Sequence, residues 1–277
     1  MTLREALLRG RRRPRAWGSG SPTTYRGDGY EFVELRSYVP GDDVRRIDWA
    51  ATARAGALQT RVVLEDVALT LAAIVDDSGS MQVGRQRRLI DAAEDALELW
   101  LESALSDDRV MRVGPDVVVP RQGLRGRQAA RIAKAPLQVA FDLRSCLETA
   151  QAALPRGSAL LAISDWHDAE RPEVARLLAE LGRRFDCTAL VARDPWYDDF
   201  PPRGFTTFRG TEGGSLAVFV GARERVRYVR AVQEREARIV RSLEEARWRV
   251  GVLHESDGTA ALADAFGIPH FRRERVG

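Results

Sequence analysis

Two nearly continuous apolar stretches constrain the fold of this chain more than any other feature. The first covers residues 67–75 and is followed by Asp76; the second covers residues 159–164 and is followed by Asp165. Strands that are apolar on both faces are typical of parallel sheets covered by helices on both sides. The sequence therefore predicts an α/β domain in which two buried strands are each followed by an acidic residue.

Helical periodicity separates these stretches. Apolar residues recur every three or four positions, which places them on one face of each predicted helix. The predicted helices cover residues 86–105, 127–135, 143–154 and 172–181, and shorter strands cover residues 110–113, 117–119 and 187–192. This alternation predicts a doubly wound, mostly parallel sheet with one antiparallel hairpin.

Changes in composition and pattern along the sequence divide the chain into three predicted parts. Residues 1–24 contain a Gly-Ser-rich linker and predict a basic, partly disordered arm. Residues 25–66 are dense in turn signals and aromatic residues and predict a small, β-rich N-terminal lobe. Residues 67–277 hold the α/β domain with a C-terminal extension. In that extension we expect an edge hairpin at 205–208 and 216–220, a long helix at 224–247, a strand at 248–253 and a helix at 260–266.

The N-terminal arm is strongly basic. Residues 1–27 carry seven arginines and one glutamate, in a chain whose net charge is +3. Such an arm could bind nucleic acid, anionic lipid or an acidic partner, although a solvated, partly mobile terminus is the favoured interpretation. No recognition helix, aromatic RNA-binding pair or zinc finger accompanies the arginines. Nucleic-acid binding through the arm is therefore kept only as an alternative, and no specific nucleic acid is expected.

Cysteine usage and hydropathy indicate the compartment. Cys146 and Cys187 lie far apart in apolar segments, which is typical of core thiols in a reducing environment. No stretch reaches the roughly 18–20 uninterrupted apolar residues that a membrane helix needs. We therefore expect a cytoplasmic protein without a transmembrane segment.

The residues after the first buried strand form the pattern D-x-S-x-S. Asp76, Ser78 and Ser80 offer one carboxylate and two hydroxyls from a tight strand-to-helix loop. A hard divalent cation such as Mg²⁺ prefers oxygen ligands of this kind, and Asp165 could add a further oxygen, directly or through water. An incomplete shell would leave one position for a carboxylate of a partner. The alternative is that Ser78 or Ser80 merely caps the following helix.

This loop resembles the metal-ion-dependent adhesion site of von Willebrand factor A domains. The block R-S-Y-V-P-G-D-D-V-R-R-I-D-W at residues 36–49 resembles the signature of the bacterial "domain of unknown function 58" family. The resemblance covers most of the chain, from about residue 30 to about residue 266. It implies a von Willebrand factor A-type sheet and a non-enzymatic adaptor or maturation factor. Such a factor would act with a MoxR-type AAA+ ATPase, its client protein, or both.

The chain departs from the family pattern at one expected ligand. The adhesion site normally takes a threonine from a second loop, and Phe141 stands at that position. Asp142 or Ser145 could substitute for it. The implied cofactor is Mg²⁺, with Mn²⁺ or Ca²⁺ as alternatives.

Other polar residues are candidates for partner contact. They are Asp77 beside the loop and Asp42, Asp43 and Arg46 in the signature. For the three signature residues, a role in scaffolding the turn after Pro40 is an equally good interpretation.

Enzymatic chemistry is not expected. The chain has three histidines, His167, His254 and His270, and lacks the H-E-x-x-H, paired C-x-x-C and P-loop motifs. The best enzyme alternative is a Mg²⁺-dependent, phosphatase-like reaction with Asp76 as nucleophile. Haloacid dehalogenase-like phosphatases, however, carry a second aspartate where this chain has Ser78, so the expected general acid is missing.

Overall fold

The computed structural model describes Leu3 and residues 31–268, except 41, 43, 65–67, 122 and 210–213. For 31–34, 62–64 and 209 it describes the backbone alone. The chain divides into two compact units, Thr2–Ala68 and Leu69–Gly277, and each is considered by itself. Apart from Leu3, the predicted basic arm lies outside the described residues.

The first unit contains a two-stranded antiparallel sheet and a short helix. Strand β1 (Glu31–Ser37) pairs with β2 (Gln59–Leu64), with a register shift between Phe32 and Glu34. Between them lie a 3₁₀ turn, η1 (Val44–Arg46), and helix α2 (Trp49–Ala55). Asp48 begins α2 by accepting a hydrogen bond from the backbone N of Ala51 at 2.9 Å. Gly56 ends it in the left-handed conformation, at φ 68°.

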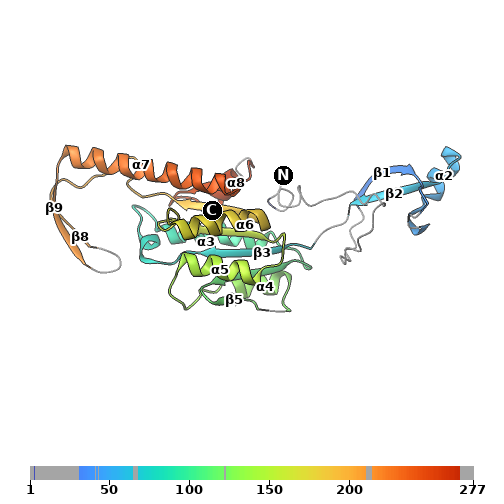
Figure 1. Cartoon of the computed structure of the whole chain (residues 1–277), viewed down its shortest axis with the longest axis horizontal. Helices are drawn as coiled ribbons and strands as arrows, with labels where there is room; N and C mark the ends of the chain where they lie inside the picture. Colours follow the sequence, from blue (N-terminus) through green and yellow to red (C-terminus); the bar gives the residue numbers. More distant parts are fainter. Residues whose placement is uncertain are drawn as a thin grey trace, which may run out of the picture. The chain divides into compact units, whose positions relative to one another are not determined.

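The second unit is built on a six-stranded sheet of order β10-β7-β6-β3-β4-β5. Its strands are β3 (Thr70–Val75), β4 (Arg109–Gly114), β5 (Val117–Val119), β6 (Ala159–Ser164), β7 (Asp186–Ala192) and β10 (Arg249–Leu253). Five of the strands are parallel, and β5 alone runs antiparallel, against β4. The predicted α/β class with a mostly parallel sheet and one antiparallel hairpin is therefore confirmed (Figure 1).

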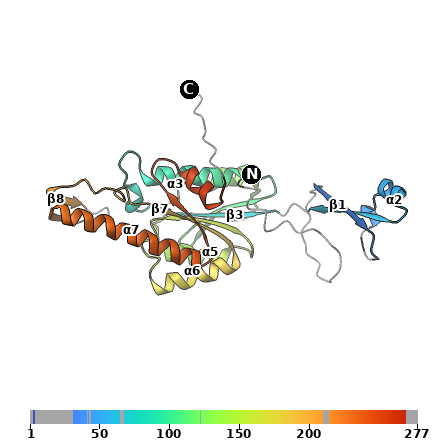
Figure 2. The same ribbon diagram turned by 90° about the horizontal axis from the view of Figure 1, so that it is seen from above.

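Helices cover both faces of this sheet (Figure 2). One face carries α3 (Leu89–Glu102), α4 (Gly126–Ala133) and α8 (Gly258–Ala265); the other carries α5 (Leu143–Ala153), α6 (Pro172–Arg184) and α7 (Ala222–Glu245). Alternate residues of the central strands face the two helical layers: Ala72 and Ile74 of β3, for example, pack in the core cluster formed with α5 and α6. Because both faces are covered, every residue of β6 is buried, which explains its unbroken apolar sequence.

The C-terminal hairpin differs from its predicted placement. Strands β8 (Gly204–Arg209) and β9 (Ser215–Val220) pair over six positions, but they form a sheet of their own. The prediction of an edge hairpin was therefore wrong about the edge. The place beside β7 is taken by β10, whose five residues all pair with it, so no backbone groups remain there for a hairpin. The predicted tip, Glu212-Gly213-Gly214, lies largely outside the described residues.

Two leucines of α3 provide a test of this layered core. Leu101 is fully buried, whereas Leu99, two residues earlier on the same helix, is 37% exposed. We expect Leu101→Ala to lower the free energy of unfolding by about 3 kcal/mol, since it leaves a cavity between helix and sheet. The matched Leu99→Ala should cost less than about 1 kcal/mol. Urea denaturation measures both, and equal losses would contradict the described packing of α3.

Candidate functional site

The candidate site lies where the carboxyl ends of β3 and β6 meet. Val75 pairs with Ile163 at the ends of these neighbouring parallel strands, and the backbone N of Asp76 donates to the carbonyl of Ile163 at 2.9 Å. The chain leaves β3 toward β4 on one side and leaves β6 toward β7 on the other. This reversal of strand order is a topological switch point, where open α/β sheets usually bind their ligands.

Asp76 is the buried centre of the site. Only 2% of its surface is exposed. One carboxylate oxygen accepts from the backbone N of Ser78 at 2.9 Å, and the other accepts from Oγ of Ser164 at 2.7 Å. Burial raises the pKa of Asp76, and the hydrogen bonds from Ser78 and Ser164 oppose that rise. Within the described residues, no arginine, lysine or histidine forms an ion pair with this carboxylate.

The two serines of the motif face each other. Oγ of Ser78 lies 3.0 Å from Oγ of Ser80, in and beside the 3₁₀ turn η2 (Gly79–Gln82). Neither serine caps the helix that follows, because α3 begins at Leu89 with Arg88 at its N-cap position, and Ser78 makes no side-chain cap to η2. The capping alternative raised from the sequence is therefore wrong. Met81, which is fully buried, anchors the turn.

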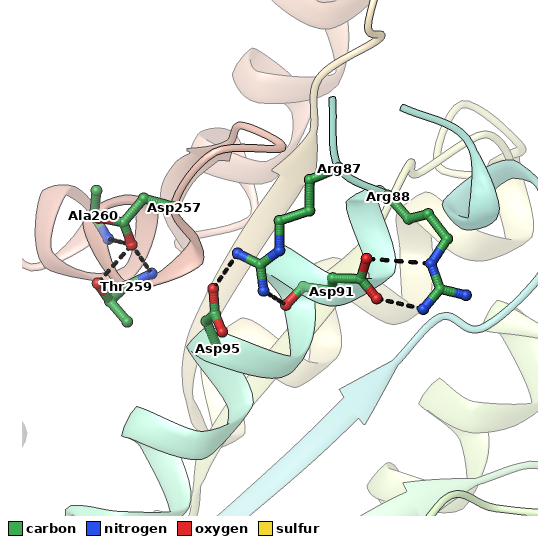
Figure 3. A network of polar contacts seen from close by, with 7 residues as sticks. All are labelled: Arg87, Arg88, Asp91, Asp95, Asp257, Thr259 and Ala260. Atoms are coloured by element: carbon green, nitrogen blue, oxygen red, sulfur yellow. Dashed lines mark hydrogen bonds and ion pairs between the residues drawn. The ribbon is translucent and has the colours of Figure 1, made fainter. Parts of the chain in front are cut away.

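Polar contacts fasten the rest of the loop between β3 and α3. The carboxylate of Glu255, from the segment after β10, accepts from the backbone N of Arg85 at 2.6 Å and of Gln86 at 3.1 Å. Arg87 pairs with Asp95, and Arg88 pairs with Asp91, at the start of α3 (Figure 3). These contacts hold the C-terminal end of the loop that carries the serines.

A strained residue holds the second loop. Trp166 is fully buried with φ 56°, a backbone conformation that costs a non-glycine residue energy. Its backbone N donates to Oγ of Ser164 at 3.1 Å, and its indole N donates to the carbonyl of Leu190 at 3.0 Å. Asp165 is thereby held between two buried residues, and its charge raises the pKa of Asp76 in addition to the larger effect of burial. One oxygen of Asp165 accepts from the backbone N of His167 at 2.9 Å.

The third segment holds the replacements expected for the missing threonine. Asp142 caps α5 by accepting from the backbone N of Arg144 at 3.1 Å, and Oγ of Ser145 donates to it at 2.6 Å. Both side chains are thus engaged at the helix start. Phe141 is half-buried and packs on the core under the sheet face. Its ring fills space and offers no oxygen to an ion.

Cys146, on the first turn of α5, is a fully buried thiol. Burial, with smaller contributions from the charges of Asp142, Asp76 and Asp77, raises the pKa of Cys146 to about 12. The prediction that Cys146 is a core thiol is therefore confirmed.

The site also contains a buried arginine that the sequence analysis overlooked. Arg112 lies on β4, and its guanidinium donates to the carbonyl of Ala135 at 3.0 Å. Among the described residues its Nε has no partner. Burial lowers the pKa of Arg112, against the charges of Asp77 and Glu94. A charged residue inside the otherwise apolar strand 110–113 was the signal that could have pointed to it.

The signature residues lie in the other compact unit. Asp42 is buried; it pairs with Arg36 at 2.6 Å and accepts from the backbone N of Val39 at 2.9 Å. Its carboxylate therefore closes the turn around Pro40. Arg46 is half-buried, and Asp43 lies outside the described residues. Contact between any of these residues and a partner stays a prediction.

Two features are absent from the described residues. No three or more His, Cys, Asp or Glu side chains among them form a group able to hold a metal ion. Any ion bound at Asp76 would therefore depend on the serine hydroxyls. In the same part of the chain, no helix combines the length and apolar content needed to cross a bilayer.

Comparison with known proteins places the chain in a family. The family model described as "Protein of unknown function DUF58" matches residues 34–238. The chain belongs to this family. It is 27% identical over 230 residues to the uncharacterized protein Rv1480 of Mycobacterium tuberculosis (strain H37Rv), covering 78% of this chain and 72% of that protein. The uncharacterized protein Mb1516 of Mycobacterium bovis matches equally well.

One solved structure is also similar to this DUF58 chain. The crystal structure of the conserved hypothetical protein BatB from Bacteroides thetaiotaomicron aligns with a TM-score of 0.46 and 12% sequence identity. The alignment covers 72% of this chain and 96% of BatB.

The buried carboxylate gives a pH-dependent test. Because the folded protein raises the pKa of Asp76, it binds this proton more readily than the unfolded chain does. The charged carboxylate should therefore lower the free energy of unfolding as the pH rises from the unfolded pKa, about 3.9, through the higher folded pKa. We expect the stability of Asp76→Asn relative to the unsubstituted protein to increase over this range. Urea denaturation in a chelator, at steps from about pH 4 to about pH 7, measures the difference.

An exposed aspartate serves as the control. Asp107→Asn, in the turn before β4, should show no comparable gain with pH. If the difference in the free energy of unfolding between Asp76→Asn and the unsubstituted protein stayed constant with pH, the raised pKa of Asp76 would be contradicted.

Proposed function

We propose that this DUF58 protein is a non-enzymatic, metal-dependent docking module of von Willebrand factor A type. It acts as an adaptor or maturation factor with a MoxR-type AAA+ ATPase, its client protein, or both. The observation that carries the proposal is the pair of serine hydroxyls facing each other beside a buried, unpaired carboxylate at the switch point.

The serine spacing fits a small, hard cation. Mg²⁺ holds oxygen ligands at about 2.0–2.1 Å in octahedral geometry, so adjacent ligand oxygens lie about 2.9 Å apart. The Oγ atoms of Ser78 and Ser80 are separated by 3.0 Å. These two hydroxyls can therefore occupy neighbouring coordination positions without rearrangement of the loop.

The charge of the site also fits a cation. A carboxylate buried to the extent of Asp76 is costly unless an opposite charge accompanies it. The charge of Asp165 acts on Asp76, and the charge of Asp77 acts on Arg112. Both acids therefore add negative potential in this region. A divalent cation would offset this potential and remove the cost of burying Asp76.

Each residue has a definite part in this proposal. Ser78 and Ser80 bind the ion, and Asp76 and Asp165 bind it directly or through water. Ser164 and the backbone of Trp166 orient the two acids. The bound ion supplies an electrophilic position that accepts a carboxylate of the partner. Phe141 adds no ligand, so binding should be weaker than at a complete site unless Asp142 or Ser145 leaves its capping role.

The phosphatase-like alternative receives less support from the same geometry. A nucleophile must reach its substrate, whereas Asp76 is buried with a hydrogen bond on each oxygen. The position expected to hold a general acid is Ser78, which cannot serve at neutral pH. Nucleic-acid binding through the basic arm concerns residues that the structure does not describe.

Metal binding can be tested by its effect on stability. We expect Mg²⁺ to raise the melting temperature of the protein, since an ion that binds only the folded state at 100 times its Kd contributes about 2.7 kcal/mol. Ser78→Ala and Asp76→Ala should abolish the rise, whereas Ser106→Ala, in the exposed turn before β4, should keep it. Scanning calorimetry with Mg²⁺ and with chelator measures the shift, and stabilisation of all variants alike would refute a site at these residues.

Partner docking requires a separate experiment. Tagged protein is used to capture partners from a lysate of the native organism with Mg²⁺, with chelator, and with the Asp76→Ala variant. We expect mass spectrometry to identify a MoxR-type ATPase only with Mg²⁺ and intact Asp76. Equal recovery in all three conditions would retain the partner and reject the metal bridge, whereas absence of the ATPase would reject the partnership.

A further inference from the structure

The β8–β9 hairpin presents an aromatic pair to solvent. Phe205 lies directly opposite Phe219 in the ladder, and their rings meet edge to face at 5.3 Å. Phe205 is 90% exposed and Phe219 is 56% exposed. Thr207 and Ala217 continue the same face and are exposed as well. A contiguous aromatic surface of this kind marks an interaction site more often than a free surface.

The opposite face of the hairpin is packed at Phe208, although Leu216 beside it is 65% exposed. Phe208 stacks on Phe200 at 5.7 Å, and Phe200 stacks on Tyr228 of α7 at 4.2 Å. The hydroxyl of Tyr228 donates to Asp194 at 2.8 Å, and Arg225 donates to the carbonyl of Phe200. The hairpin is therefore held against α7 by one face, and the exposed aromatic pair is presented on a fixed support.

Both outer edges of this small sheet lack partners within the described structure. β8 pairs only with β9, and no other described backbone hydrogen bond involves either strand. A two-stranded sheet is marginally stable by itself, and a free edge offers a row of N–H and C=O groups to an added strand. An extended peptide can use such an edge, gaining affinity from the main chain and specificity from alternate side chains.

The neighbouring start of α7 is basic. Arg223, Val226 and Arg227 lie on one helical face, and Val226 is 69% exposed. Neither arginine forms an ion pair with another described residue, whereas Arg225 pairs with Asp199 and Arg230 with Glu234.

The aromatic pair adjoins this basic helix. A Cβ atom placed on Gly221 would lie 3.6 Å from the ring of Phe219, so the pair borders the first turn of α7.

We propose that the β8–β9 hairpin and the start of α7 bind an extended, acidic segment of a partner protein as a third strand. Its main chain pairs with a free edge of the hairpin, its apolar side chains cover Phe205 and Phe219, and its carboxylates reach Arg223 and Arg227. A second copy of this chain would bring like charges together at the same surface. An anionic bilayer could meet the apolar and basic groups but would leave the strand edge unused. This surface is separate from the proposed metal site and does not depend on it.

The test uses the full-length protein and a fluorescent synthetic peptide of alternating valine and glutamate, roughly six residues long to match a typical strand. Fluorescence anisotropy measures binding at low and high salt. Two further probes are a valine–lysine peptide and the acidic peptide with alternate backbone amides methylated. We expect the acidic peptide to bind and to weaken with salt, and the two other peptides to bind at least about tenfold more weakly.

Variants at exposed positions separate the surface from general effects. The doubles Phe205→Ala with Phe219→Ala, and Arg223→Glu with Arg227→Glu, should each weaken binding about tenfold or more. Leu105→Ala and Arg131→Glu serve as controls because both side chains are exposed and lie outside the hairpin and α7. These two substitutions should leave binding of the acidic peptide unchanged. All four proteins should melt at the temperature of the unsubstituted one.

Several results would overturn the proposal. Equal binding of the methylated peptide would exclude strand addition. Full binding by the two double variants would place the peptide elsewhere. Binding to vesicles containing phosphatidylserine without binding to the acidic peptide would assign the surface to a membrane. Failure of the acidic peptide to bind the unsubstituted protein would reject an acidic strand as the occupant.

Discussion

The pairing of β3 with β6 is the constraint on which the arrangement of the second unit depends. The two strands lie side by side at the point where the chain turns in opposite directions, so their ends are the one place where loops from both halves of the sheet can meet. The hydrogen bond from Ser164 to Asp76 joins those ends directly. It also satisfies an acceptor that burial would otherwise make costly. Helices on both faces of the sheet exclude water from this hydrogen bond. The bond is therefore strong, and its loss would lower the stability of the folded protein.

A rigid support surrounds a polar site of small size. Trp166 holds its loop through a strained backbone and two hydrogen bonds from buried atoms, and its ring meets Trp248 edge to face at 5.7 Å. Glu255 reaches across from the end of β10 to the loop after Ser80. The strained backbone of Trp166 and the buried carboxylate of Asp76 each lower the stability of the fold, and the packing of the surrounding core offsets this loss. Sites with such costs are commonly those that bind something, which agrees with a docking role for the acids and hydroxyls at the switch point.

Helix α7 connects this site with the hairpin. Near its start it carries Tyr228, which holds the hairpin through Phe200. Further along, Arg235 contacts Nδ1 of His167, and Arg238 pairs with Glu170 in the segment that follows Asp165. Arg193, at the end of β7, binds Glu236 through two hydrogen bonds. One long helix therefore supports both the loop of the proposed metal site and the proposed strand-binding surface, so two partners, or two parts of one partner, can be positioned relative to each other.

The sequence by itself determined the sheet and the acids that follow its strands. Nearly continuous apolar runs at 67–75 and 159–164 are typical of strands buried on both faces, and three- and four-residue spacing places the apolar residues of a helix on one face. The same local reasoning located Asp76 and Asp165, but it also suggested serine caps, which the start of α3 at Leu89 excludes. Only the tertiary structure decided that β10, and not the hairpin, would pair with β7 and that Arg112 would be buried. It also decided that Asp142 and Ser145 would be engaged in capping α5. These outcomes depend on which distant segments compete for the same edge, space or hydrogen bond, and periodicity along a chain carries no information about that competition.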